Sequence, residues 1–559
     1  MTPASSPQHW SSPRQHWARL ALGLVILLAA HILLRGYVTD DTYIHLRYTE
    51  NLLHRAEFSF NPGEATYGAT SPLWIMGLLF FLKLGLSGPA AAWALGLLSG
   101  GLMVVLLAGL LRRLAFPESW RWWLFALAVV DAWFLRWTMS GMETPLATAA
   151  LLVLLWPLVM ESPEPTAHTA RRLRLRYLAW GVAAGLAALV RPEFMLLGPA
   201  ALPWLLLYEY RRGDALAGAA GRVRARPHGL LLASAAGWLL SAGPWLVYAQ
   251  LTFGRCTPGT ASAKSFTASL SVVEIAQYLG RSVQQLGMTQ GVIWFFFILL
   301  VVVVLLERRR QASGWVDPEG ELRPGQWRFW RAVCLVLVVF TWVGVLLGGY
   351  AVKKVWTISR YLSPLSPCIL LMIGVLSYWL LNIATPFRGR PALGTWVASL
   401  ACGLALLSNV LLLTGPVRTH ATQFSAGVVE CYLDKGVWLG ENAGPDDVVA
   451  ALDIGAIAYG SDRVVLDLMG LVSPEIMVMG RQMGFQEMVD SGLWLRNDHR
   501  QGPPPRWFVD RHEGLPRWDG KTMHGITFEL VDTCTIHGVG LRETQDWTVS
   551  TYRLVPEGL

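Results

Sequence analysis

The chain has 559 residues, of which 53% are hydrophobic and only 15% are charged, and its mean hydropathy is +0.40. This composition excludes an ordinary soluble enzyme and predicts a polytopic α-helical membrane protein. In a soluble chain, a formal net charge of +8 would suggest nucleic-acid binding. Here the basic residues cluster between apolar segments, so we expect membrane lipids as partners and no nucleic acid.

Apolar segments fill the chain up to residue 414. A helix needs about 20 apolar residues to cross the hydrocarbon core, and by this measure we predict about 11–13 spans. They lie near residues 17–36, 71–87, 89–111, 120–137, 142–160, 177–190, 194–209, 229–251, 288–306, 330–349, 361–383 and 392–414.

Arginine clusters set the expected orientation, because basic loops stay on the cytoplasmic side of a membrane. The clusters are at residues 171–176, 211–226 and 308–310. This orientation puts the loop from residue 40, the loops 253–287 and 350–360, and the region after 415 outside. Complete crossings by all twelve segments would return the C-terminus to the cytoplasm. We therefore expect one partial segment between residues 71 and 137.

The loop after the first span carries two adjacent carboxylates, Asp40 and Asp41. Acidic side chains are costly near the hydrocarbon boundary, so they are candidates for a functional site. A carboxylate at the mouth of a membrane cavity suits a general base that takes the proton of a hydroxyl. The alternative is a helix stop exposed to lipid headgroups. Residues 42–54 then have the spacing of an amphipathic interfacial helix.

The character of the sequence changes after residue 414. Residues 415–559 are polar, and short apolar runs predict buried strands at 448–452, 464–466, 506–509 and 551–555. With a helical stretch near 420–440, they predict an extracytoplasmic α/β domain that is separate from the transmembrane domain over 1–414. Cys431 and Cys534 fall in this region. They form a disulfide if it folds in an oxidising compartment, and otherwise they remain free thiols.

Several motifs resemble a known family when they are taken together and in order. The first outer loop, residues 40–70, contains D-D-T-Y-I-H-L-R-Y-T-E-N-L, F-N-P-G-E and the start of Y-G-A-T-S-P-L-W. Later motifs are S-G-M-E-T-P-L at 140–146, R-P-E at 191–193, F-G-R-C-T-P-G-T-A-S-A-K at 253–264, S-R-Y-L-S-P-L-S-P at 359–367 and D-I-G-A-I-A-Y-G at 453–460. The set resembles the GT-C superfamily of glycosyltransferases. The nearest match is the branch that contains the terminal β-arabinofuranosyltransferase of actinobacterial cell walls.

This resemblance implies an enzyme of the cytoplasmic (inner) membrane that transfers one sugar with inversion. The donor is a polyprenyl-phosphate-linked sugar, arabinofuranose or another pentose or hexose, and the acceptor is a glycan or a lipid-linked molecule on the outer face. In such enzymes an acidic residue at the start of the first outer loop is the base. Here that is Asp40 or Asp41, and the alignment favours Asp40. Departures from the nearest branch at Thr42 and at residues 68–71 leave the donor sugar open.

A reaction that expels a lipid phosphate needs cations that face the developing negative charge. Arg191, Lys264 and Arg360 lie in or beside predicted outer loops, and together they are the candidate phosphate pocket. The alternative for the two arginines is an interfacial role, in which the charged head reaches the headgroups.

Further site candidates come from the same motifs. They are Arg47, Tyr67, Trp74, Glu143, Glu193, Lys353 and Tyr361. Glu143 either acts as a second acid near the acceptor or pairs with Arg191, and Lys353 either binds substrate or contacts lipid headgroups. His45 is assigned to the surface or the core. Acidic side chains could supply oxygen ligands to a divalent metal, but we expect no metal and no other cofactor.

Two other functions fit many spans with charges inside the membrane. One is a transporter or flippase of lipid-linked saccharides, which does not need a paired-acid loop or an appended domain. The other is a scaffold that binds glycan without chemistry. Loss of sugar transfer on changing the two aspartates, with donor binding retained, would favour the enzyme.

Overall fold

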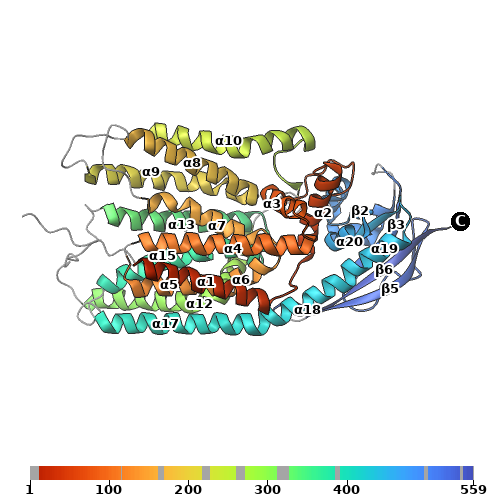
Figure 1. Cartoon of the computed structure of the whole chain (residues 1–559). Coiled ribbons are helices and arrows are strands. Elements are labelled where there is room, and N and C mark those ends of the chain that lie inside the picture. Colours follow the sequence, from red (N-terminus) through yellow and green to blue (C-terminus); the bar gives the residue numbers. More distant parts are fainter. Residues whose placement is uncertain are drawn as a thin grey trace, which may run out of the picture.

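The computed structural model describes residues 12–114, 116–160, 169–216, 227–259, 271–310, 327–383, 391–496, 502–541 and 545–557. A bundle of long helices joins a mixed α/β domain at one end (Figure 1). In these ranges, eight helices are long and apolar enough to cross a membrane, which confirms the predicted polytopic fold. They are Pro13–Leu33 (α1), Gly88–Arg113 (α4), Ala170–Val190 (in α8), Pro227–Phe253 (α10), Val272–Leu306 (in α12), Phe329–Val352 (in α13), Ser359–Leu381 (α14 to α15) and Leu393–Asn442 (α17 to α19).

Several predicted spans are short or broken. Helix α3 (Pro72–Lys83) has 12 residues, and at 1.5 Å per residue it extends only about 18 Å, less than the ~30 Å hydrocarbon core. The predicted segment 120–137 divides into α5 (Glu118–Val129) and α6 (Ala132–Met139). Asp131 causes the break, because its carboxylate accepts hydrogen bonds from the first amides of α6. Two segments between 71 and 137 therefore fail to form a single spanning helix.

The other helices of the membrane part connect or extend these spans. They are α2 (Asp40–Arg55), α7 (Thr144–Leu154) and α9 (Leu197–Leu216). The span at Ser359–Leu381 is built from α14 (Ser359–Leu362) and α15 (Ser366–Ile383). The full bounds of α8, α12 and α13 are Thr169–Val190, Val272–Arg310 and Trp327–Val352. In Figure 1, α2 and α3 lie at the end of the bundle that faces the sheet.

A single helical run leads from the membrane part into the α/β domain. It comprises α17 (Pro391–Leu412), α18 (Arg418–Val428) and α19 (Asp434–Asn442), which are joined by π-helical turns. Figure 1 shows α17 and α18 as neighbouring parts of one rod that reaches from the bundle to the sheet. The composition changes at residue 414, but the helix does not end there.

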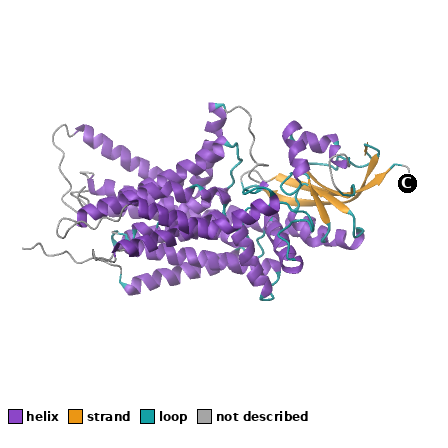
Figure 2. Ribbon diagram, turned by 90° about the horizontal axis from the view of Figure 1, so that it is seen from above, coloured by secondary structure: helices purple, strands orange, loops and turns teal. Residues whose placement is uncertain are grey.

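The sheet of the α/β domain has six strands in the order β2-β1-β3-β6-β5-β4. Strands β1 (Val448–Ala451), β2 (Val464–Asp467) and β3 (Pro505–His512) are parallel neighbours, and the remaining pairs are antiparallel. The other strands are β4 (Thr522–Met523), β5 (Ile526–Val539) and β6 (Gln545–Pro556), and the helices are α20 (Gly455–Ser461), α21 (Pro474–Met483) and α22 (Phe485–Ser491). Figure 2 shows the sheet set off from the helical bundle at the C-terminal end.

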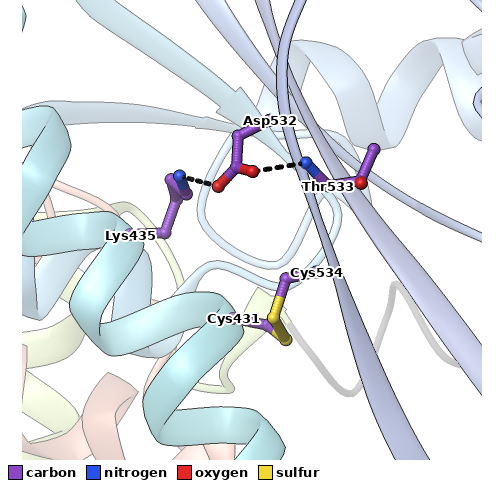
Figure 3. The surroundings of a disulfide bond; sticks show 5 residues. All are labelled: Cys431, Lys435, Asp532, Thr533 and Cys534. Atoms are coloured by element: carbon purple, nitrogen blue, oxygen red, sulfur yellow. Dashed lines mark hydrogen bonds and ion pairs between the residues drawn. A yellow bond between two sulfur atoms is a disulfide. The ribbon is translucent and has the colours of Figure 1, made fainter.

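A disulfide links the helical run to the sheet. Cys431, in the π turn before α19, bonds Cys534 of β5, with 5.4 Å between their Cα atoms (Figure 3). Lys435 pairs with Asp532 beside it. Of the two alternatives for this cysteine pair, the structure therefore has the disulfide.

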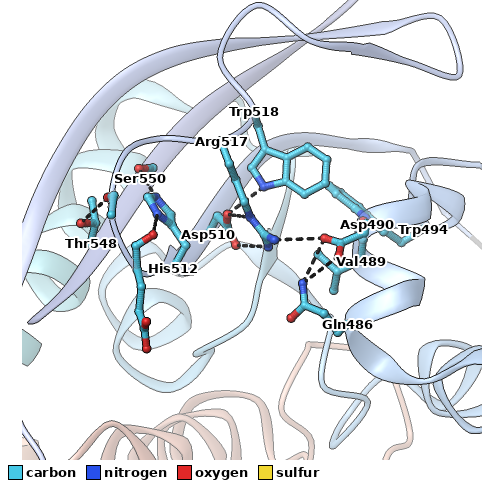
Figure 4. A network of polar contacts seen from close by, with 12 residues as sticks. Gln486, Val489, Asp490, Trp494, Asp510, His512, Arg517, Trp518, Thr548 and Ser550 are labelled. Carbon is cyan, nitrogen blue, oxygen red and sulfur yellow. Dashed lines mark hydrogen bonds and ion pairs between the residues drawn. The ribbon is translucent and has the colours of Figure 1, made fainter. Parts of the chain in front are cut away.

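A polar network surrounds Asp510 of strand β3 (Figure 4). Asp510 of β3 is fully buried, and it accepts hydrogen bonds from Arg517 Nε at 3.0 Å and Trp518 Nε1 at 2.8 Å. Arg517 also reaches Asp490 at 3.0 Å. A buried carboxylate is tolerated only when it is paired in this way, so we assign this network to the stability of the domain.

Candidate active site

A cavity of about 290 Å³ lies where the helical bundle meets the α/β domain. Its walls come from α2, the loop that follows α2, the ends of α8 and α13, the start of α14, and the segment after β2. Six charged side chains line it: Asp41, Glu143, Arg191, Glu193, Lys353 and Arg360. The cavity thus brings together residues from motifs that are far apart in the sequence.

The two adjacent carboxylates of α2 face different surroundings. Asp41 lines the cavity and forms an ion pair with Arg360. Asp40 lies against the α/β domain, where its two oxygens accept hydrogen bonds from the amides of Gly455 at 3.0 Å and Ala456 at 2.8 Å. Successive residues of a helix point about 100° apart. The arrangement does not support the sequence-based preference for Asp40, because only Asp41 faces the cavity.

The position of Asp40 also affects its ionisation. Burial and the nearby carboxylate of Asp453 raise the pKa of Asp40 to about 7, although the two backbone amides oppose this shift. The pKa therefore reflects contacts with the α/β domain rather than contacts in the cavity.

Two buried arginines, Arg191 and Arg360, line the cavity and contact each other. Arg191 follows α8, and its Nε lies 2.9 Å from Glu193 Oε1 and 3.7 Å from Glu143 Oε1. Although burial opposes the charge, the two glutamates raise the pKa of Arg191 above its ordinary value. Its NH1 donates to the carbonyl of Arg360 at 2.8 Å. The Tyr361 ring lies 5.4 Å from the Arg191 guanidinium and 5.2 Å from that of Arg360, so both arginines also contact an aromatic face.

The two lysine candidates differ in what the structure shows. Lys353 is exposed at the cavity, and among the described residues it has no carboxylate partner. Its neighbour Lys354 instead pairs with Glu274 at 3.0 Å. Lys264 falls in 260–270, outside the residues that the structure describes. Lys353 is therefore a cavity cation whose charge is not already neutralised by a described acid.

Three other candidates lie outside the cavity. Arg47 is buried and pairs with Asp462 at the end of α20. Tyr67 packs between the first outer loop and α10, and it accepts a hydrogen bond from Trp245 at 2.7 Å. Trp74 is completely buried in the core. Its indole is therefore part of the packing and is not available to a substrate in this cavity.

Two titratable residues of the cavity, His45 and Tyr350, were not predicted as site residues. His45 was assigned to the surface or the core, but it lines the cavity and is nearly buried. Burial lowers its pKa, so its imidazole is neutral at pH 7. The signal was its spacing, because residues four apart share one face of a helix and Asp41 precedes it by four. Tyr350, which donates to Glu193 at 2.8 Å, has no comparable signal in the sequence.

Comparison with known proteins supports the fold. Crystal structures of ArnT from Cupriavidus metallidurans, with bound undecaprenyl phosphate and in the apo state, match with TM-scores of 0.54 and 0.56. The matches cover 96% and 97% of this chain and 97% and 98% of ArnT, at 13% identity in both cases. At this identity they show a shared fold. The chain has the fold of ArnT.

The sequence is also similar, over part of its length, to that of a curated arabinofuranosyltransferase. It is 31% identical over 246 residues to the terminal β-(1→2)-arabinofuranosyltransferase of Mycobacterium tuberculosis. That match covers 41% of this chain and spans only 35% of the length of the relative. Residues 420–553 match a family model described as a domain of unknown function, DUF8728.

The geometry of the cavity suits proton transfer beside an anion. Asp41 is a cavity carboxylate, and cationic side chains lie next to it. The cavity carboxylates already have cationic partners. Asp41 pairs with Arg360, and Glu143 and Glu193 pair with Arg191. Within the described ranges, no three His, Cys, Asp or Glu side chains form a group that could hold a metal ion.

Proposed function

We propose that this chain catalyses the inverting transfer of a single sugar from a polyprenyl-phosphate donor to a hydroxyl of a glycan or lipid-linked acceptor. The observation that carries the proposal is the pairing of Asp41 with Arg360 in a cavity that Arg191 and Lys353 also line. Undecaprenyl phosphate bound to ArnT supports a polyprenyl-phosphate donor. The name of the Mycobacterium tuberculosis relative makes arabinofuranose the first sugar to test.

In the proposed reaction, the acceptor oxygen attacks the anomeric carbon on the face opposite the phosphate. The bond between that carbon and the phosphate oxygen breaks, and its electron pair leaves with the polyprenyl phosphate. The acceptor proton moves to the carboxylate of Asp41. The donor phosphate competes with Asp41 for Arg360, so donor binding frees the base at the moment when it is needed. Preorganised cations then stabilise the departing phosphate.

The proposed location is the outer face of the cytoplasmic membrane. Arg191 ends α8 at the cavity, whereas the arginines at 171–176 lie near the start of this 22-residue helix. At 1.5 Å per residue the two ends are about 30 Å apart, roughly the thickness of the hydrocarbon core. Because arginine-rich ends favour the cytoplasmic side, the cavity and the α/β domain are assigned to the opposite side.

Purified protein in proteoliposomes tests the function directly. We expect a labelled sugar to move from polyprenyl phosphate to an acceptor glycan with inversion at the anomeric carbon. Movement of the intact lipid-linked sugar across the bilayer without a new glycosidic bond would identify a flippase. Glycan binding with neither event would identify a scaffold, and either result would contradict the proposal.

We expect Lys353→Ala to weaken donor binding. Loss of a partly exposed cation that contacts a phosphate should raise the KM for the donor about tenfold, while kcat stays within about twofold. Steady-state kinetics against donor concentration measures both constants. Lys354→Ala is the matched control, because that ammonium pairs with Glu274 and does not line the cavity. Equal KM values for the two variants would remove Lys353 from the phosphate site.

We also propose that transfer does not require a divalent metal, because the cavity carboxylates are already paired with arginines. Treatment with EDTA should leave the initial rate of transfer within about twofold of the untreated enzyme. A loss of activity that Mg²⁺ or Mn²⁺ restores would contradict this proposal.

A further inference from the structure

The first outer loop contacts the α/β domain at three separate places. At the start of α2, the Asp40 carboxylate accepts hydrogen bonds from the first two backbone amides of α20. In the middle of α2, buried Arg47 pairs with Asp462. Beyond α2, the Asn61 amide group donates to the carbonyl of Val465 and accepts from its amide, both at 2.9 Å. Asn61 thus binds strand β2 as a neighbouring strand would.

At two glycines, the first outer loop and the α/β domain lie so close together that a Cβ atom would collide with the other surface. A Cβ atom on Gly455 would lie 2.0 Å from the carbonyl oxygen of Asp40. A Cβ atom on Gly68 would lie 2.4 Å from the side chain of Val472. Leu471 and Val472 then reach the cavity and form part of its wall. Glycine is required at these two positions because backbone and side chain meet there without space for a methyl group.

From this fit we propose that the α/β domain is a positioning module of the active site, and that the adjacent aspartates have different tasks. Asp40 docks α2 onto the domain, and this docking directs Asp41 toward Arg360 and the cavity. The domain also closes the cavity with Leu471 and Val472. This inference rests on the proposed function, and it assigns a role to a domain whose matching family has no known one.

The contacts of Asp40 support docking, because backbone amides of α20 already engage both of its carboxylate oxygens. Its carboxylate is held beside Asp453, which is itself paired with Arg511 at 2.9 Å. Burial and Asp453 raise the pKa of Asp40 to about 7, so both disfavour its ionised form. The two backbone amides offset that opposition only while α2 and α20 remain in contact. The contact is therefore a specific one, and it ties the start of α2 to one position.

A small displacement of α2 would matter for the chemistry. Asp41 follows Asp40 directly, so a shift or rotation at the docked residue moves the catalytic carboxylate with it. A misplacement of about 1 Å in a catalytic group can lower a rate about 100-fold. Undocking should therefore lower kcat, whereas the cations assigned to the donor phosphate lie outside α2: Arg191 follows α8, Lys353 follows α13 and Arg360 belongs to α14.

Two substitutions test the docking without replacing either aspartate. Gly455→Ala places a methyl group against Asp40, and Asn61→Ala removes both hydrogen bonds to Val465. Gly280→Ala is the control, because its Cβ would have no atom within 4 Å. The full chain in nanodiscs is studied by hydrogen exchange of the peptides over 453–467 and by donor-saturated transfer kinetics.

We expect both docking variants to exchange faster than wild type over 453–467, with kcat lowered about tenfold or more and the donor KM changed less than about twofold. The Gly280→Ala control should match wild type in both measurements. Faster exchange with an unchanged kcat would overturn the positioning role, and unchanged exchange would overturn the docking contact. Because the exchange measurement uses no substrate, failed docking is distinguished from failure of the proposed transfer reaction.

Discussion

Asp41→Asn is expected to lower kcat for sugar transfer about 10²–10⁴-fold, the usual effect of removing a general base. Donor binding should persist. The neutral amide no longer competes with the donor phosphate for Arg360, so the donor Kd should stay the same or decrease. Transfer kinetics and equilibrium binding of the polyprenyl-phosphate donor measure the two effects separately.

Asp40→Asn is the comparison that separates the two adjacent acids. It keeps the shape of the side chain but replaces one of the two oxygens that accept amides of α20. Loss of one such hydrogen bond at a docking contact should lower kcat about tenfold at most. If Asp40→Asn abolishes transfer while Asp41→Asn retains it, the assignment of the base to the cavity carboxylate is wrong.

Arg191→Met is expected to lower the free energy of unfolding by about 3–5 kcal/mol, because it leaves buried carboxylates without their cation. Arg191 and Glu143 are 5% and 3% exposed in this pair, so water does not replace the lost partner. Denaturant unfolding of the purified protein in detergent measures the change.

Arg55→Met is the matched control, since Arg55 is 36% exposed and its partner Asp462 is 59% exposed. Removing such a surface pair should change stability by less than about 1 kcal/mol. Combining Arg191→Met with Glu143→Gln and Glu193→Gln should recover most of the loss, because no buried charge then remains unpaired. Similar effects of Arg191→Met and Arg55→Met would contradict the buried ion-pair arrangement.

The sequence predicts the parts of the site that depend on composition and local motifs. The helical membrane fold, the α/β domain, and the presence of Arg191, Arg360 and one of the paired aspartates at the cavity follow from apolar runs and motifs. His45 was within reach of the same reasoning, because its spacing from Asp41 places both residues on one helix face.

The remaining features depend on contacts between distant segments. The choice between Asp40 and Asp41 requires the rotation of α2, which no motif specifies. Arg47 lies outside the cavity because it pairs with Asp462, a residue of the α/β domain. Trp74 belongs to a motif of the first outer loop, but α3 places its side chain in the core. Strand β5 is missed because exposed and buried residues mix irregularly along it.

The contact of Asp40 with Gly455 and Ala456 joins residues more than 400 positions apart, and it has a consequence for biosynthesis. The cavity wall includes residues of the first outer loop and of the last quarter of the chain. It is therefore incomplete until that last quarter has been synthesised and lies on the same side of the bilayer. Such distant pairings form slowly. The nascent protein can therefore complete its membrane helices before the wall of its cavity is closed.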